Sequence, residues 1–136
     1  MTRENAIRRL FGLWAVVAAA PALLVTAQTI AGKYGDDAQI AWSWLFAQIT
    51  PVLAILLAAV FSEPSSRWKS AQAHQWKFSC ALGASIAQAV LMLSVLIIEP
   101  LVTVSTFDLF DKTQIILSLL QGVVVAAVGA VIFDGR

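Results

Sequence analysis

The sequence contains few ionisable side chains and almost no sulfur chemistry. Only 12% of its 136 residues are charged, and it has one cysteine, Cys80, and one histidine, His74. A single cysteine excludes an intrachain disulfide and a paired-thiol redox motif, and a single histidine excludes a pair of axial haem ligands. Nine basic and eight acidic residues give a net charge of +1, so the composition does not point to a nucleic-acid partner.

The chain is instead strongly apolar, with 60% hydrophobic residues and a mean hydropathy of +0.82. Four runs of 19 to 21 residues contain no Asp, Glu, Lys, Arg or His: Leu10–Ile30, Ala41–Phe61, Phe78–Ile98 and Ile115–Phe133. As helices they would be about 30 Å long, the thickness of the hydrocarbon core of a bilayer. Because they lack the polar stripe of a soluble bundle, we predict an all-α, polytopic membrane protein with four transmembrane helices.

The distribution of basic residues predicts the orientation of these spans. Seven of the nine lie in the N-terminal tail, the middle loop and the C-terminus: Arg3, Arg8, Arg9, Arg67, Lys69, Lys77 and Arg136. Basic loops stay in the cytoplasm, so both termini are expected there, in the cell inner (plasma) membrane. Tryptophans flank the spans where aromatic belts anchor helices at the membrane interface: Trp42, Trp44, Trp68 and Trp76.

The N-terminal region also fits a secretory signal peptide, with basic residues followed by the apolar stretch Leu10–Leu24 and the small residues Val25-Thr26-Ala27. Cleavage there would leave three spans and place the N-terminus outside. The apolar run continues to Ile30, which favours a retained first span. The connections have at most 16 residues and cannot bury a core. We therefore predict one transmembrane domain, residues 1–136, without a soluble domain.

Three short segments carry local signals. Thr2 is expected to cap the first helix, and Thr106 is expected to cap a short turn that carries Phe107 and Phe110 inward. Residues 67–77 between the second and third spans are expected to form an interfacial helix.

The residues that several kinds of transport and catalysis need are missing from the spans. A proton-coupled carrier needs a carboxylate or histidine at membrane depth, and the spans have none, unlike the small multidrug transporters. No group of His, Cys, Asp and Glu has the spacing of metal ligands. Four serines in the spans have no base at their depth: Ser79, Ser85, Ser94 and Ser118. We therefore expect no enzyme activity and no cofactor, with Cys80 as a packing residue and His74 as an interfacial one.

Three amides are the main polar groups within the spans. Gln48, Gln88 and Gln121 would come within about 6 Å of one another in depth if the helices were straight. Hydroxyls accompany them at Thr50, Ser85 and Ser118. Because an amide in lipid leaves its donors and acceptors unpaired, these side chains should point at each other or at water. They could link helices in the interior or line a conducting path.

Small residues and prolines suggest how the helices pack. Small residues recur every four positions in two ladders: Ala81, Ser85 and Ala89, and Gly122, Ala126 and Ala130. Such ladders allow helices to approach closely, either within one bundle or between chains. Pro21 and Pro51 lie near the middle of their spans, where each removes a helical hydrogen bond and is expected to kink the helix.

Two strings carry a family resemblance: Trp42-Ser43-Trp44-Leu45-Phe46-Ala47-Gln48-Ile49-Thr50-Pro51, and Leu117-Ser118-Leu119-Leu120-Gln121-Gly122-Val123-Val124. The chain resembles small, uncharacterised bacterial four-helix membrane proteins. That resemblance implies the architecture, and membership of a system in which another chain senses and this one acts at the membrane.

These observations lead to three functional hypotheses. The first is an oligomeric pore-like or membrane-perturbing component, lined by the amides and controlled by a separate sensing chain. The second is a scaffold or anchor subunit of a larger membrane complex. The third is a facilitator for a small neutral solute, since neutral cargo needs no charge within the membrane. The expected partners are the lipid bilayer and either further copies of the chain or another membrane subunit.

Overall fold

Four long helices make up the computed structural model, which describes residues 2–61, 74–101 and 105–133. They are α1 (Arg3–Ile30), α2 (Ala38–Phe61), α4 (Gln75–Ile98) and α5 (Thr106–Ile132), with short 3₁₀ turns at Gly35–Asp37 and Glu99–Leu101. Each predicted span lies within one helix, except that Phe133 forms the C-cap of α5. All four helices are long and apolar enough to cross a membrane.

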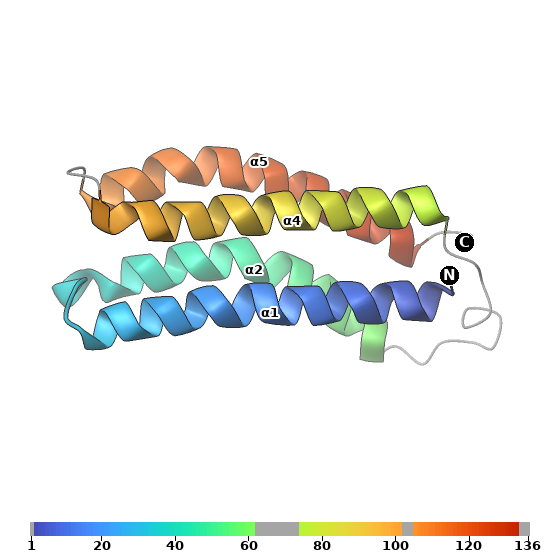
Figure 1. The fold of residues 1–136 in the computed structure, drawn as a ribbon, viewed down its shortest axis with the longest axis horizontal. Helices are drawn as coiled ribbons and strands as arrows, with labels where there is room; N and C mark the ends of the chain where they lie inside the picture. The colour runs from blue at the N-terminus through green and yellow to red at the C-terminus, as the bar shows by residue number, and fades with distance from the viewer. Residues whose placement is uncertain (1, 62–73, 102–104, 134–136) are drawn as a thin grey trace.

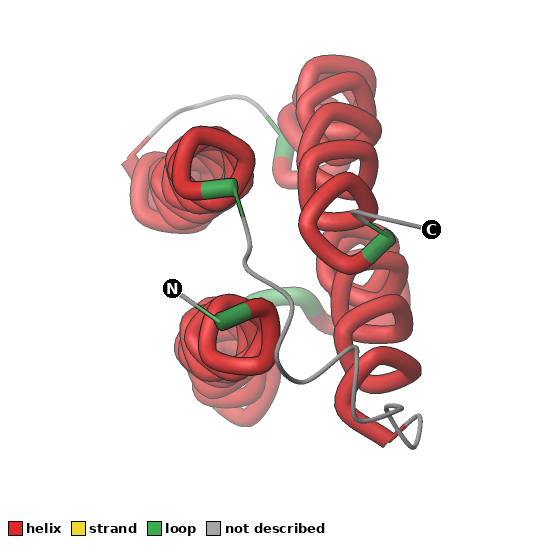
Figure 2. The backbone as a smooth tube through the Cα atoms, turned by 90° about the vertical axis from the view of Figure 1, so that its right-hand side faces the viewer, coloured by secondary structure: helices red, strands yellow, loops and turns green. Residues whose placement is uncertain are grey.

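The helices form an antiparallel bundle of two layers, with α1 and α4 in one layer and α2 and α5 in the other (Figures 1 and 2). The two termini lie at the same end, which we call the terminal end (Figure 1). The opposite end, the hairpin end, holds the α1–α2 connection and the Glu99–Leu101 turn. Because α2 and α5 both start at the hairpin end, they run parallel to each other and pack side by side.

Local capping sets the helix ends. Thr2 Oγ1 accepts a hydrogen bond from Asn5 N at 3.4 Å, which confirms the predicted cap of α1. The predicted cap of the last segment was wrong by one residue, because Ser105 Oγ accepts from Asp108 N at 3.2 Å and Thr106 is already helical. The expected short turn is therefore the beginning of α5 itself.

A glycine ends α1 and turns the chain. Gly32 has φ +71°, and its N–H donates to Thr29 O while the N–H of Lys33 donates to Gln28 O, both at 3.0 Å. These two bonds satisfy the last carbonyls of the helix in the pattern that favours glycine. The motif places Lys33 and Tyr34 at the hairpin end, where the Tyr34 hydroxyl donates to the side chain of Gln28.

The core is a seam of inward residues spaced alternately by three and four. On α5 the inward positions are Phe110, Leu117, Gln121, Val124, Val128 and Val131, and the half-buried Gln114 completes the series. This is the spacing of helices that pack nearly parallel, as in coiled coils. Ser118 and Gly122, each one position beyond a seam residue of α5, are exposed, whereas Ile132 beside Val131 is buried.

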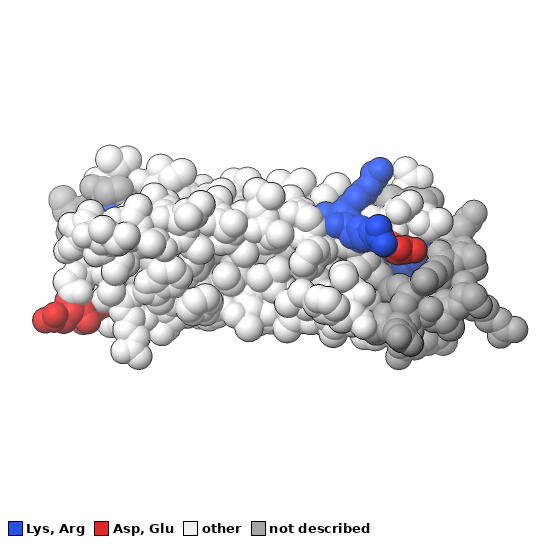
Figure 3. All heavy atoms as spheres, turned by 90° about the horizontal axis from the view of Figure 1, so that it is seen from below, with Lys and Arg blue, Asp and Glu red and all other residues white. Residues whose placement is uncertain are grey.

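The outside of the bundle is apolar as well. Each helix exposes large hydrophobic side chains. Examples are Leu23, Phe46, Val90 and Leu119, which are between 51% and 71% accessible. On the face in Figure 3, acidic and basic side chains lie only near the two ends, with uncharged surface between them. A water-soluble bundle would carry its charges along this surface.

Both mid-span prolines lie within continuous helices. Pro21 is buried in α1 and Pro51 is exposed in α2, and each helix continues on both sides of its proline. The kinks that we expected at these positions therefore stay predictions. The expected interfacial helix, with Trp68, lies outside the described residues except for its last four positions: His74 is the N-cap of α4, and residues 75–77 belong to its first turn.

Candidate functional site

Three amides from three helices are buried in the core. Gln48 on α2 and Gln88 on α4 are fully buried, and Gln121 on α5 is 6% exposed. All three occupy seam positions, so the sequence places amides where a bundle normally carries Leu or Val. Their burial requires hydrogen-bond partners inside the protein.

The structure links a different set of three amides from the one we predicted. Gln88 Nε2 donates to the backbone oxygen of Gln48 at 3.2 Å, and Gln48 Nε2 donates to Gln114 Oε1 at 3.3 Å. We call this α4–α2–α5 connection the amide chain. Gln121 follows Gln114 by seven residues, so it lies about 10 Å further along α5. Gln114 was not among the amides predicted to meet, because its distance from α2 depends on how the helices pack.

Polar atoms in this core remain without a partner. Gln48 Oε1, Gln88 Oε1 and Gln121 Nε2 are buried, and no described atom completes their hydrogen bonding. A buried unpaired donor or acceptor costs about 1–3 kcal/mol. Water or a polar solute between the helices would pair with them, since two acceptors and one donor match the groups that such a molecule offers.

A second polar contact joins α1 to α4, the two helices of the other layer. Trp14 Nε1 donates to Ser85 Oγ at 3.0 Å, and both residues are fully buried. Ser85 lies one helical turn from Gln88 on the same face of α4, so the polar groups of the core continue toward the terminal end. Trp14 was not predicted from the sequence as a polar contact. The available signal was a mid-span indole N–H, which needs an acceptor when buried.

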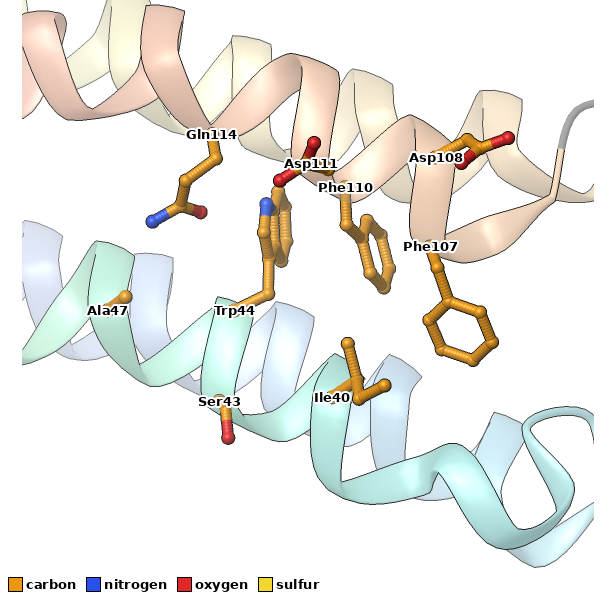
Figure 4. A pocket seen from close by; sticks show the side chains of 9 residues that line it. All are labelled: Ile40, Ser43, Trp44, Ala47, Phe107, Asp108, Phe110, Asp111 and Gln114. Atoms are coloured by element: carbon orange, nitrogen blue, oxygen red, sulfur yellow. The ribbon is translucent and has the colours of Figure 1, made fainter.

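Above the amide chain, an open groove of about 560 Å³ lies between α2 and α5 at the hairpin end (Figure 4). Its lining consists of aromatic, acidic and small residues: Ile40, Ser43, Trp44, Ala47, Phe107, Asp108, Phe110, Asp111 and Gln114. Gln114 belongs to both the groove and the amide chain. The amide chain therefore reaches the groove at Gln114.

The groove combines an unpaired donor with nearby carboxylates. Trp44 stacks on Phe110 with ring centroids 4.6 Å apart, and its Nε1 is buried without a described partner. Figure 4 shows the indole standing between the helices with its nitrogen turned toward α5. Asp108 and Asp111 are exposed at the rim. Such a groove offers a hydrogen-bond donor, negative charge and aromatic walls to a ligand.

The predicted polar interior is only partly assembled. Ser85 joins the core, whereas Thr50 and Ser118 are exposed on the outside of the bundle. The physical reason is their register, because Thr50 and Ser118 each lie one helical position off a buried seam residue, Ile49 or Leu117.

The two small-residue ladders also differ in burial. Ala81, Ser85 and Ala89 are buried along α4, whereas Gly122, Ala126 and Ala130 are exposed along α5. A Cβ atom added at Gly122 would meet no other atom within 4 Å. The α5 ladder therefore makes no close helix contact within the described bundle.

The tryptophans predicted as interface anchors have different surroundings. Trp76 is 64% exposed at the terminal end, and Trp42 is half-buried against Phe46, with ring centroids 5.5 Å apart. Trp44 is 5% exposed and lies inside the bundle. It is a wall of the groove rather than a surface residue.

An ion pair links two connections at the hairpin end. Lys33 pairs with Glu99, whose carboxylate is buried and also accepts a hydrogen bond from Thr106 Oγ1 at 2.6 Å. Burial lowers the pKa of Lys33 from its ordinary value of 10.5, and burial raises the pKa of Tyr34 beside it. The pair ties the α1–α2 connection to α4 and α5. Its members are 66 residues apart, and no sequence pattern connects them.

Reactive groups are not collected into a centre in the described part of the chain. No three His, Cys, Asp or Glu residues there are grouped as metal ligands. Cys80 is exposed, and His74 precedes α4 without a side-chain capping bond. What the described arrangement offers chemically is binding, through the groove and the amides.

Comparison with known proteins gave no match: no family model, curated protein or solved structure corresponds to this chain. The four-helix architecture agrees with the resemblance noted from the sequence.

Proposed function

We propose that this chain is a non-enzymatic integral protein of the inner (plasma) membrane, with four spans and both termini in the cytoplasm. The apolar outer surface and the restriction of charge to the bundle ends support insertion. The described basic residues of the terminal end, Arg3, Arg8, Arg9 and Lys77, outnumber Lys33 and Lys112 at the hairpin end. This bias supports an outward-facing hairpin end.

The function that the geometry supports best is a facilitator for a small neutral solute, taken into the protein's own bundle from the hairpin end. The observation that carries this proposal is the shared position of Gln114, which lines the groove and hydrogen-bonds to Gln48. A solute entering the groove would meet the amide chain and its unpaired acceptors. Amides can exchange hydrogen bonds with a neutral solute without any change of charge.

The same geometry favours this function over a pore lined by the amides of several copies. Such a pore needs the amides on the outside of each chain, facing a shared axis. Here Gln48, Gln88 and Gln121 lie between the helices of one bundle. We therefore place the proposed path within a single chain.

Solute flux tests the proposal. Proteoliposomes should swell several times faster than empty liposomes in a stopped-flow assay with urea or glycerol. Replacing the two fully buried amides by leucine, in Q48L/Q88L, should return the rate to that of empty liposomes. The matched control T50L/S118L removes two exposed polar groups and should keep the wild-type rate.

Two outcomes would contradict the proposal. One is wild-type flux no greater than that of empty liposomes for every solute tested. The other is a Q48L/Q88L variant that keeps both its helical content and its flux.

A second candidate, the scaffold or anchor subunit, is favoured by one observation. Gly122, Ala126 and Ala130 are exposed, with open space at Gly122, and small residues on a helix surface allow another membrane helix to approach. Purification in a mild detergent tests it. A stoichiometric foreign subunit that is lost in a Gly122→Leu variant would support the scaffold over the facilitator.

A further inference from the structure

Below the groove, both of its helices continue with small exposed residues. On α2, Ala47 lines the groove, and Pro51, Ala54 and Ala58 follow it at helical spacing, all of them exposed. On α5, Ser118 and Gly122 follow Gln114 in the same way and are also exposed. We call these five residues beyond the groove the small-residue strip. It extends the groove along the span.

The groove itself has an incomplete set of polar contacts. Trp44 is 95% buried, since only 5% is exposed, and its Nε1 has no described acceptor. Figure 4 shows Asp111 above this indole and Asp108 at the outer edge. A complementary ligand carries a cation for the carboxylates, an uncharged acceptor for the indole and an apolar chain for the strip.

We infer that the groove and the strip hold a phospholipid whose headgroup carries an ammonium group, choline or ethanolamine. The ammonium lies beside Asp108 and Asp111, where the aromatic walls also favour a cation. A glycerol-ester carbonyl accepts from Trp44 Nε1. One acyl chain follows the strip toward Ala58.

The dimensions fit this occupant. From Ala47 to Ala58 is eleven residues, about 16 Å along a helix, which is half of the roughly 30 Å hydrocarbon core and so the reach of one acyl chain. The groove residues lie next to the predicted span boundaries at Ala41 and Ile115, at the depth of headgroups. The inference rests on the proposed membrane insertion. A bound lipid and a solute entering from the hairpin end would compete for the same groove, so lipid retention is measured without solute and apart from flux.

The carboxylates also predict which lipid is disfavoured. An anionic headgroup such as phosphatidylglycerol brings a net negative charge to Asp108 and Asp111 without an ammonium to offset it. The inference therefore predicts selectivity for a zwitterionic lipid at this position. A membrane helix in the strip would show no such selectivity for headgroup charge.

Native mass spectrometry of detergent-solubilised protein, given equal phosphatidylcholine and phosphatidylglycerol, tests the selectivity. The wild type should retain one phosphatidylcholine, about three to five times more often than phosphatidylglycerol, as exposed ion pairs allow. D108N/D111N should bring this ratio close to one, and W44F should lower retention of phosphatidylcholine. The matched control D36N/D37N removes two exposed carboxylates at the same end, outside the groove, and should keep the wild-type ratio.

A photoactivatable phosphatidylcholine with its diazirine halfway along the acyl chain locates the site. Labelling should fall on residues 51–58 of α2 or 118–122 of α5. Circular dichroism of each variant verifies that it folds as the wild type does. The inference is overturned if the wild type shows no lipid selectivity, if D108N/D111N retains that selectivity, or if D36N/D37N loses it to the same extent. It is also overturned if the label falls outside the two stretches, or if the protein forms a lipid-free dimer that depends on Gly122. Because none of these measurements uses flux, they fail independently of the proposed facilitator.

Discussion

Two ladders of small residues have the same spacing and opposite surroundings. Ala81, Ser85 and Ala89 lie in the core against the rest of the bundle, whereas Gly122, Ala126 and Ala130 face away from it. The difference lies in register. The α4 ladder coincides with seam positions, whereas Gly122 lies one position beyond the buried Gln121, about 100° around the helix.

The comparison shows that a small-residue ladder predicts close approach but does not identify the partner. On α4 the space beside the ladder is filled by the chain itself, including the Trp14 side chain that donates to Ser85. On α5 it is open to a lipid chain or a foreign helix. Substitutions that add or remove a few atoms on each ladder distinguish these surroundings.

The largest expected effect comes from enlarging the buried ladder. Ala81→Leu should destabilise the bundle by about 1–3 kcal/mol, because a fully buried position has no room for three more carbons. Ala126→Leu, on the exposed ladder, should change stability by no more than about 0.5 kcal/mol. Unfolding in mixed micelles, followed by circular dichroism, measures both. Equal losses for the two variants would show that the ladders do not differ.

The next effect compares polar groups inside and outside the seam of α2. Gln48→Leu should cost about 1 kcal/mol, because Gln114 Oε1 loses its donor within the protein and the removal of the unpaired Gln48 Oε1 offsets part of that loss. Thr50→Leu should leave stability within about 0.5 kcal/mol of the wild type. The same unfolding assay applies. A larger loss for Thr50→Leu would reverse the assignment of the inward and outward faces.

A smaller effect of opposite sign is expected at the exposed glycine. Gly122→Ala should stabilise the isolated chain by about 0.5–1 kcal/mol, since alanine favours the helix and its Cβ meets no atom within 4 Å. The midpoint of thermal unfolding should therefore rise. A fall would mean that Gly122 contacts another helix closely under the conditions of the assay.

The smallest effect concerns the hydroxyls. A double-mutant cycle with Trp14→Phe and Ser85→Ala should give a coupling of about 0.6 kcal/mol, the average for hydrogen bonds between membrane helices. The parallel cycle with Trp14→Phe and Ser118→Ala should give none, because Ser118 is exposed. Coupling of the same size in both cycles would remove the distinction between buried and exposed hydroxyls.

The fold was largely predictable from local signals. Long runs without charge predicted the four helices and their C-terminal ends to within one residue, although the helices begin three to nine residues before the runs, and the Thr2 cap was predicted correctly. The cap of α5 was predicted one residue late, since Ser105 and Thr106 are both residue types that cap helices. A cap is chosen by where the helical hydrogen bonds begin, which depends on how the preceding turn packs.

The site was less predictable. Depth along straight helices placed Gln48 and Gln88 together correctly, but it also included Gln121 and left out Gln114. Depth is only one of three coordinates, and the rotation of each helix about its axis decides which side chains meet. Thr50 and Ser118 have the right depth and the wrong rotation. The Lys33–Glu99 pair depends on the meeting of two separate connections.

The order of the residues by itself determined that the spans contain no charged side chain and that charge is confined to the ends of the helices, because each residue carries its hydropathy wherever it folds. Only the tertiary structure decided which amides hydrogen-bond, which ladder is buried, and that Trp44 forms the wall of a groove. Those outcomes follow from the packing of four helices around one seam, and packing depends on the mutual rotation of helices that are far apart in the chain.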